Sequence, residues 1–225
     1  MKKLLLVWGG ARIGDTLHLI PYIYEHQDYE ITWLVGSYEY EVAKFIQYNY
    51  PNITNITSMH DGFPMSIDNR IAFRNKYEHY YEHSKFDKVE TRIDISTDLT
   101  NDYFKKGTDY LPKIKQEDCE PYICYHADSI SKWKHMSNIN NYVIPNIKGV
   151  TIGRQGEKIV KGTEDRTGLS LLESAKLIKN SILFVGIASA MSCLNIYLNH
   201  PGICLQFAKD LFKFSNYCVK VKDIY

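Results

Sequence analysis

The sequence of 225 residues lacks several features that would assign it to a specialised class of protein. Its five cysteines form no Cys-x-x-Cys pair, which argues against a disulfide framework or a zinc module. No apolar run approaches the ~18 residues needed to cross a bilayer. With 27 basic and 26 acidic side chains the net charge is +1, so no whole-protein field attracts nucleic acid or an anionic membrane. We therefore expect a soluble globular protein with reduced thiols, located in the cytoplasm.

The start of the chain, MKKLLLVWGG, imitates a secretion signal because two lysines precede an apolar run. That run, Leu4 to Trp8, is shorter than the apolar region of a signal peptide, and no small-residue cleavage site follows it. We interpret it as a buried strand that ends at Gly9 and Gly10.

Strand-like and helix-like segments alternate along most of the chain, which predicts an α/β fold with parallel sheets. Apolar runs and helical periodicity define the expected elements. The expected strands are 3–8, 31–35, 56–59, 89–95, 122–125, 150–152, 182–185 and 202–205, and the expected helices are 15–25, 40–48, 68–83, 97–106, a short one after Ser131, 170–179 and 188–198.

A stretch between the two halves looks like a linker, because Gly107, Pro112 and Pro121 flank charged residues without periodicity. We therefore predict two Rossmann-like lobes, residues 1–115 and 116–225, whose parallel sheets face each other across a cleft. Ligands of such sheets bind beyond the carboxyl ends of the strands.

The stretch LLLVWGGARIGD places one carboxylate, Asp15, at the start of a helix that follows a glycine-ended strand. It has neither the GxGxxG spacing of a dinucleotide site nor the GK[ST] of a P-loop. Asp15 could stabilise the helix dipole, or it could act as a general base. Spacing alone favours the structural role.

Four pieces of the sequence resemble glycosyltransferase family 9, the heptosyltransferase-like enzymes with the two-lobed GT-B fold. RIGDTLHLIPYIYEHQDYEITWLV is similar to the opening of that family, and YICYHADSISKWKH to its H-P-G-x-S-x-x-K-x-W loop. The other two pieces lie in one string, DRTGLSLLESAKLIKNSILFVGIASAMSCLNIYLNHPGICLQF: its first part resembles the family's D-L-T-G helix, and its second part resembles the strand, helix and strand that follow. The pieces cover about half of the chain, in the family's order. The resemblance implies inverting transfer of a sugar from a nucleoside-diphosphate sugar to an acceptor hydroxyl, without a metal.

The resemblance also implies roles for individual residues. Asp15 matches the position of the family's general base, and Glu157 that of the acid that binds the nucleoside ribose. The residues expected to contact the acceptor or a phosphate are Arg12, Gly14 and His18, and those expected to bind the donor are Ser131, Lys132 (with Lys134 as its rival), Gly153, Glu157, Thr167, Gly168, Ser189 and Ser192.

The chain departs from the family at two points. It is shorter, and Ala188 to Asn195 replaces the family's D-S-G-x-x-H-x-A, so the acid, the glycine and the histidine of that motif are missing. Two alternatives therefore stay open: transfer to a hydroxymethylated base in DNA, with tyrosines and lysines of residues 69–92 as the DNA-facing patch, or a non-catalytic binding subunit. The donor sugar, the nucleotide, the acceptor and the oligomeric state are not fixed by the sequence.

One segment has metal-ligand spacing. EHYYEH places His79 and His83 four residues apart, beside Glu78 and Glu82. It lacks the HExxH order, and a solvent-exposed polar helix has the same composition. We expect no metal site.

Overall fold

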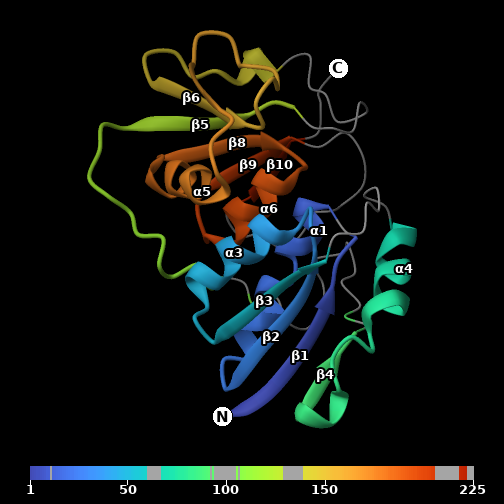
Figure 1. Ribbon diagram of the computed structural model, residues 1–225. Coiled ribbons are helices and arrows are strands. Elements are labelled where there is room, and N and C mark those ends of the chain that lie inside the picture. The colour runs from blue at the N-terminus through green and yellow to red at the C-terminus, as the bar shows by residue number, and fades with distance from the viewer. Residues whose placement is uncertain are drawn as a thin grey trace. The chain divides into compact units, whose positions relative to one another are not determined.

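The computed structural model describes residues 1–10, 12–59, 67–91, 93, 105, 107–128, 139–205 and 218–221. Its contacts divide the chain into two units, Met1–Ser96 and Thr97–Tyr225. Each unit contains one parallel sheet, as the alternating sequence pattern predicts (Figure 1). The division falls between residues 96 and 97, whereas the sequence placed it near residue 115.

The first unit is built on a four-stranded sheet with the order β3-β2-β1-β4. The central strand β1 pairs with β2 and β4, and its residues Leu4 to Trp8 are buried. This explains the unbroken apolar run, because a parallel strand covered on both faces has no polar side. The elements are β1 (Lys2–Trp8), α1 (Ile13–Leu17), α2 (Ile20–Glu25), β2 (Tyr29–Gly36), α3 (Tyr40–Asn49), β3 (Ile53–Met59), α4 (Ile67–Tyr77), the 3-10 helix η1 (His83–Lys85) and β4 (Lys88–Glu90).

Two of the expected helices in this unit have different bounds. The helix expected at 15–25 is divided into α1 and α2, and Pro21 stands in the first turn of α2. Proline has no N–H to donate and clashes with the carbonyl four residues earlier, so one continuous helix is disfavoured. The helix expected at 68–83 ends at Tyr77. Of the helix expected at 97–106 only Lys105 is among the described residues, and it is not helical there.

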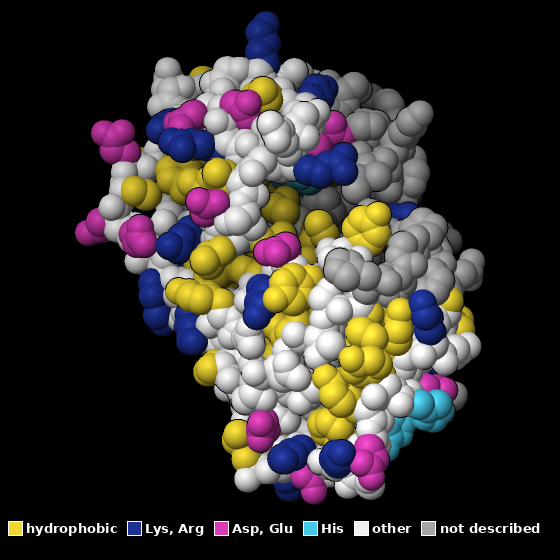
Figure 2. Space-filling model, in the orientation of Figure 1, with side chains coloured by type: hydrophobic (Ala, Val, Ile, Leu, Met, Phe, Trp, Pro, Cys, Tyr) yellow, Lys and Arg dark blue, Asp and Glu magenta, His cyan; other side chains and the backbone are white. Residues whose placement is uncertain are grey.

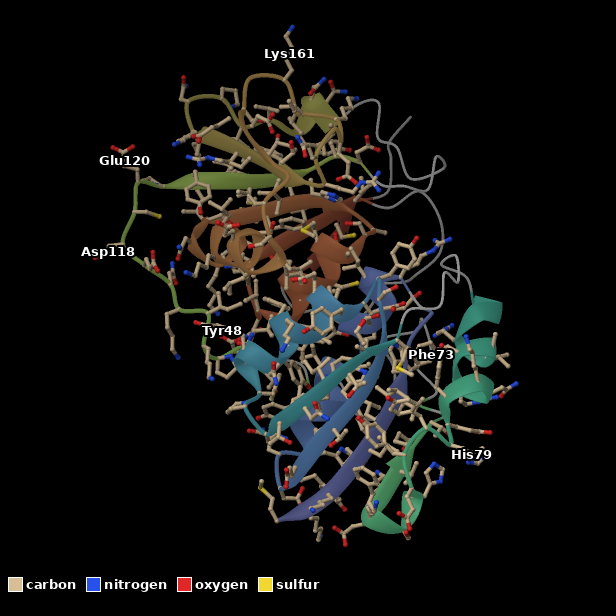
Figure 3. The ribbon with its side chains drawn as sticks, viewed as in Figure 1. Tyr48, Phe73, His79, Asp118, Glu120 and Lys161 are labelled. Atoms are coloured by element: carbon tan, nitrogen blue, oxygen red, sulfur yellow. The ribbon has the colours of Figure 1, made fainter. Side chains whose placement is uncertain are left out.

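Helix α4 is mostly polar, and Phe73 is its buried anchor. Phe73 is 1% exposed and packs in a cluster with Leu5, Val7 and Leu34 of the sheet. Figure 3 shows this side chain directed from α4 toward the strands. Phe73 therefore joins α4 to the apolar side chains of the sheet, and Tyr77 of the same helix packs against this cluster.

The second unit has a six-stranded sheet with the order β10-β9-β8-β5-β6-β7. Two of its strands were not predicted: β7 has the charged sequence EDRT at the edge of the sheet, and β10 is a four-residue strand at the other edge. The short helix expected after Ser131 lies outside the described residues. The elements are β5 (Tyr122–His126), the 3-10 helix η3 (Ile139–Tyr142), β6 (Lys148–Gly153), β7 (Glu164–Thr167), α5 (Leu171–Asn180), β8 (Leu183–Ile187), α6 (Ala190–Tyr197), β9 (Gly202–Leu205) and β10 (Cys218–Val221).

The stretch that the sequence suggests as a linker, residues 107–121, packs against the second unit. Tyr110, Leu111 and Ile114 are buried, at 0%, 0% and 1% exposure. The N–H of Tyr110 donates to the carbonyl of Tyr197 at the end of α6. These contacts place the 107–121 segment within the second unit.

The face drawn in Figure 2 carries Lys and Arg side chains interspersed with Asp and Glu. Exposed ion pairs in the described residues include Lys2 with Asp28 and Lys85 with Glu82. In the part of the chain that the structure describes, no helix combines the length and the apolar character that crossing a membrane requires.

Candidate functional site

Gly9 and Gly10, which follow β1, are each required to be glycine for a different structural reason. A Cβ added at Gly9 would lie 2.6 Å from the backbone N of Gly36 and 2.6 Å from the ring of Phe73, so no larger residue fits there. Gly10 has a φ of 74°, a conformation that favours glycine. The carboxyl end of β1 can therefore approach β2 closely and turn toward α1.

Asp15 lies in the first turn of α1, neither buried nor fully exposed. One of its carboxylate oxygens, Oδ2, accepts a long hydrogen bond from the backbone N–H of Arg12 at 3.4 Å. Gly14 lies in the same turn, and Thr16 donates its N–H and its hydroxyl to the carbonyl of Arg12. The carboxylate thus stabilises the start of the helix through Oδ2.

His18 follows Asp15 by one turn. Burial lowers the pKa of His18 to about 4, although the nearby Asp15 carboxylate opposes this effect. The imidazole is therefore neutral at pH 7 and stands beside a carboxylate. A carboxylate and a neutral imidazole are both able to accept a proton from a bound hydroxyl.

A second carboxylate of this unit, Glu39, was missed by the sequence analysis. Glu39 is only 2% exposed. A Cβ at Gly36 would touch Oε2 of Glu39 and would lie 3.3 Å from the backbone N of Gly10. Glu39 thus stands where β1 and β2 end. Its position after the second strand matches that of Asp15 after the first, and this repeated pattern was the available signal.

Four of the residues predicted to bind a donor meet at the carboxyl ends of β6 and β7. Thr167 pairs with Gly153 in the strand register, and the N–H of Gly168 donates to the carbonyl of Gly153 at 2.8 Å. Oε2 of Glu157 accepts from the N–H of Arg154 at 2.8 Å. Gly153, Glu157, Thr167 and Gly168 therefore line one edge of the sheet.

The same carboxylate belongs to a hydrogen-bonded network of three side chains, Ser189, His126 and Glu157, which we call the Ser–His–Glu network. Oε2 of Glu157 lies 3.3 Å from Nε2 of His126, and Nδ1 of His126 lies 3.0 Å from Oγ of Ser189. His126 ends β5 and its side chain is 5% exposed. The sequence analysis missed His126, although a histidine at the end of an apolar strand was visible.

The charge of Glu157 follows from these contacts. Burial alone raises the pKa of its carboxyl, but the hydrogen bonds from His126 and from the Arg154 N–H outweigh burial and leave that pKa below its ordinary value. Glu157 is therefore ionised at neutral pH and acts only as an acceptor.

The two predicted serines of α6 differ in their environment. Ser189 precedes the helix but makes no capping bond to it, because its hydroxyl contacts His126 instead. Ser192 is 1% exposed and donates to the carbonyl of Ile187. Ser189 is thus the better placed of the two to contact a ligand at the start of α6.

Three other predicted residues, Ser131, Lys132 and Lys134, lie outside the described residues.

At the EHYYEH segment, the rings of His79 and His83 are 5.4 Å apart, and His83 contacts the carbonyl of Glu78. Within the described ranges no three His, Cys, Asp or Glu side chains gather as a metal site would require.

Comparison with protein families gives no match to this sequence, and comparison with curated proteins gives none either. Solved structures do match. The glycosyl transferase of family 9 from Veillonella parvula is 12% identical, covers 98% of this chain and 86% of its own, and has a TM-score of 0.62. Heptosyltransferase WaaC of E. coli, with ADP-2-deoxy-2-fluoro heptose, is 12% identical, with coverages of 97% and 92% and a TM-score of 0.63.

A third match is the glycosyltransferase TibC of enterotoxigenic E. coli, described as dodecameric and iron-containing. It is 18% identical, covers 97% of this chain and 62% of its own, and has a TM-score of 0.58. At these identities the similarity shows the fold. The α/β fold of the family 9 heptosyltransferases, which the sequence resemblance implied, is therefore confirmed.

Proposed function

We propose that this chain is a glycosyltransferase that moves a sugar from a nucleoside-diphosphate sugar to an acceptor hydroxyl, with inversion. The observation that carries the proposal is the fold match, which extends over 97–98% of this chain and 86–92% of two family 9 structures. WaaC was solved with ADP and with an ADP-heptose analogue, which supports a nucleotide sugar as the donor.

In this proposal Asp15 is the general base. It accepts the proton of the acceptor hydroxyl while the hydroxyl oxygen forms a bond to the anomeric carbon. The bond between that carbon and the phosphate oxygen breaks on the opposite face, and its electron pair leaves with the nucleoside diphosphate. Neutral His18 stands one turn away and leaves the negative charge of Asp15 uncancelled.

The second unit binds the donor. Glu157 uses its second carboxylate oxygen for ribose hydroxyls, beside the backbone of Gly153 and Gly168. The diphosphate lies at the start of α6, where the first N–H groups of the helix have no partner within the helix and, with the Ser189 hydroxyl, favour an anion. We keep the prediction that no metal takes part in the reaction of this chain, although TibC is described as iron-containing. We also propose the cytoplasm as its location.

One set of observations favours a non-catalytic binding subunit as the second candidate. Asp15 already contacts the Arg12 N–H, as an ordinary helix-start aspartate does. In addition, Ala188, Ala190 and Cys193 occupy the places where the resembled motif has an acid, a glycine and a histidine. The DNA-base variant and its 69–92 patch stay predictions.

Thermal unfolding with UDP-, GDP-, ADP- and CMP-sugars separates the two candidates. A ligand that binds the folded state raises the melting temperature by mass action. The transferase proposal expects at least one donor to raise the melting temperature. No change in melting temperature with any of these sugars favours the binding subunit.

The identified donor then allows a test of the base. Asp15→Asn is expected to lower the transfer rate by about 10²–10⁴-fold, the usual contribution of general base catalysis. Asp28→Asn is the matched control, because Asp28 is an exposed acid paired with Lys2. Full transfer activity in Asp15→Asn would remove Asp15 from the mechanism.

A further inference from the structure

The Ser–His–Glu network fixes where its hydrogen atoms lie. Ionised Glu157 only accepts, so Nε2 of His126 must carry the hydrogen that points toward it. In the neutral imidazole Nδ1 is then an acceptor, and the Ser189 hydroxyl donates to it across 3.0 Å. The hydroxyl hydrogen of Ser189 is used in this bond to His126, so Oγ of Ser189 presents only lone pairs to an incoming group.

The surroundings of His126 hold this arrangement in place. A Cβ at Gly153 would lie 2.5 Å from Oε2 of Glu157 and 3.3 Å from Cδ2 of His126, and one at Gly186 would lie 3.4 Å from Cβ of His126. Glycine at position 153 therefore leaves room for the carboxylate and the imidazole, whereas glycine at position 186 chiefly leaves room for the ring of Phe184. The side chains of His126 and Glu157 are only 5% and 12% exposed, so water does not readily replace their hydrogen bond.

A second proton on His126 reverses the last bond of the network. Both ring nitrogens of an imidazolium donate, so Nδ1–H would donate to Oγ of Ser189. The Ser189 hydroxyl then no longer donates its hydrogen to His126 and can donate it to an anion. Protonation of His126 and binding of a phosphate oxygen at Ser189 therefore favour each other.

We propose that a phosphate group bound at Ser189 takes up one proton on His126, which makes His126 the positioning residue for the diphosphate of the donor. This inference rests on the proposed function. During transfer the diphosphate gains negative charge as its bond to the sugar breaks. The imidazolium stabilises that charge through the Ser189 hydroxyl, keeps its proton, and forms no covalent bond.

The charged groups near His126 come from the residues that follow β5 and β6. Glu157 contacts it, Arg154 stands beside Glu157, and Asp128 accepts from the N–H of Lys158. The ionisable side chains of β8 and α6 are the buried Cys193 and Tyr197 alone. The described parts of β5, β6, β8 and α6 hold no histidine other than His126, and its imidazole is the group among them that can accept a second proton.

Isothermal titration calorimetry measures the proton directly. Wild type, His126→Gln and Ser189→Ala are titrated with ADP and with inorganic pyrophosphate, in two buffers of different ionisation enthalpy, from pH 6 to pH 8. Wild type is expected to take up more protons than either variant. From pH 6 to pH 8 the affinity of wild type is expected to fall by a factor about ten times larger than the factor for His126→Gln, which is the equivalent of one pKa unit. Titration of the phosphate itself is common to all three proteins and cancels in the comparison.

His79→Gln is the control, because its side chain is 82% exposed and lies in the other unit. It should take up protons as wild type does. Thermal unfolding without ligand shows that each variant is folded. Proton uptake by His126→Gln or by Ser189→Ala that equals the uptake by wild type overturns the inference but leaves the proposed function intact. A wild type that binds neither ADP nor pyrophosphate, and none of the UDP-, GDP-, ADP- and CMP-sugars of the thermal panel, overturns both.

Discussion

Lys179 of α5 donates to the carboxylate of Asp109 at 2.6 Å and to the carbonyl of Leu198 at 2.8 Å. One side chain thus joins α5, the residue after α6 and the 107–121 segment. The Lys179 side chain is only 16% exposed, so its two acceptors depend on it more than partners at the surface would. The charged composition of this segment suggested a linker because a sequence does not reveal such partners.

Removing this ammonium group should destabilise the second unit. Lys179→Met is expected to lower the free energy of unfolding by about 1–3 kcal/mol, because Asp109 and the Leu198 carbonyl lose a partly buried donor. Urea denaturation measures the change. Lys176→Met, an exposed position of the same helix, should stay within about 0.5 kcal/mol of wild type. Equal losses in both variants would mean that the ion pair contributes nothing to holding the segment.

The attachment of α4 to its sheet should depend on Phe73. Phe73→Ala is expected to cost about 3–5 kcal/mol, because it leaves a cavity beside Leu5, Val7 and Leu34. Ile71→Ala on the same helix removes a side chain that is 49% exposed and should cost far less. Chemical denaturation of the two variants compares them. A similar loss in both would show that α4 packs through a different face.

The elements that could be predicted are those with a strong local signal. The run Leu4 to Trp8 became β1, and Ser170 with Glu173 forms the capping box that starts α5. The strand at the sheet edge, β7, has no such signal because its alternate residues Glu164 and Arg166 are charged and point to solvent or to each other. Its pairing with β6 is decided by tertiary contact, which propensity does not capture.

The candidate site shows the same limit. Asp15, Gly153 and Glu157 could be proposed from position after a strand or from resemblance. The role of His126 could not, because its partners Glu157 and Ser189 are 31 and 63 residues away along the chain. Such a network exists only once β5, β6 and β8 lie side by side.

Gly153 provides a test of the space around this network. Gly153→Ala and Gly156→Ala both introduce a side chain at positive φ, 151° and 82°, so both should lose about 1 kcal/mol through backbone strain. Only the Gly153 methyl group would meet Glu157 and His126, whereas nothing lies within 4 Å at Gly156. We expect a further loss of about 1–3 kcal/mol for Gly153→Ala. It should also weaken ADP binding in calorimetry, which Gly156→Ala should not.

His200 should make the stability of the second unit depend on pH. Burial, and then repulsion from Lys179, lowers the pKa of His200 from 6.5 to about 4, and its Nε2 lies 3.1 Å from the hydroxyl of Ser181. Between these two pH values the unfolded chain binds a proton that the folded chain does not. The free energy of unfolding therefore falls as the pH falls from 6.5 toward 4.

For His200 this loss is on the order of 3 kcal/mol by pH 4, at 1.36 kcal/mol per pKa unit. Buried His18 in the first unit acts in the same direction, so wild type combines both effects. His200→Gln keeps a polar side chain near Ser181 without the titration, and its stability should fall less steeply over this range. His79→Gln, at an exposed position, should follow the wild-type curve. Urea denaturation at intervals from pH 7 to pH 4 measures the three slopes, and a His200→Gln curve parallel to wild type would show that His200 is protonated equally in both states.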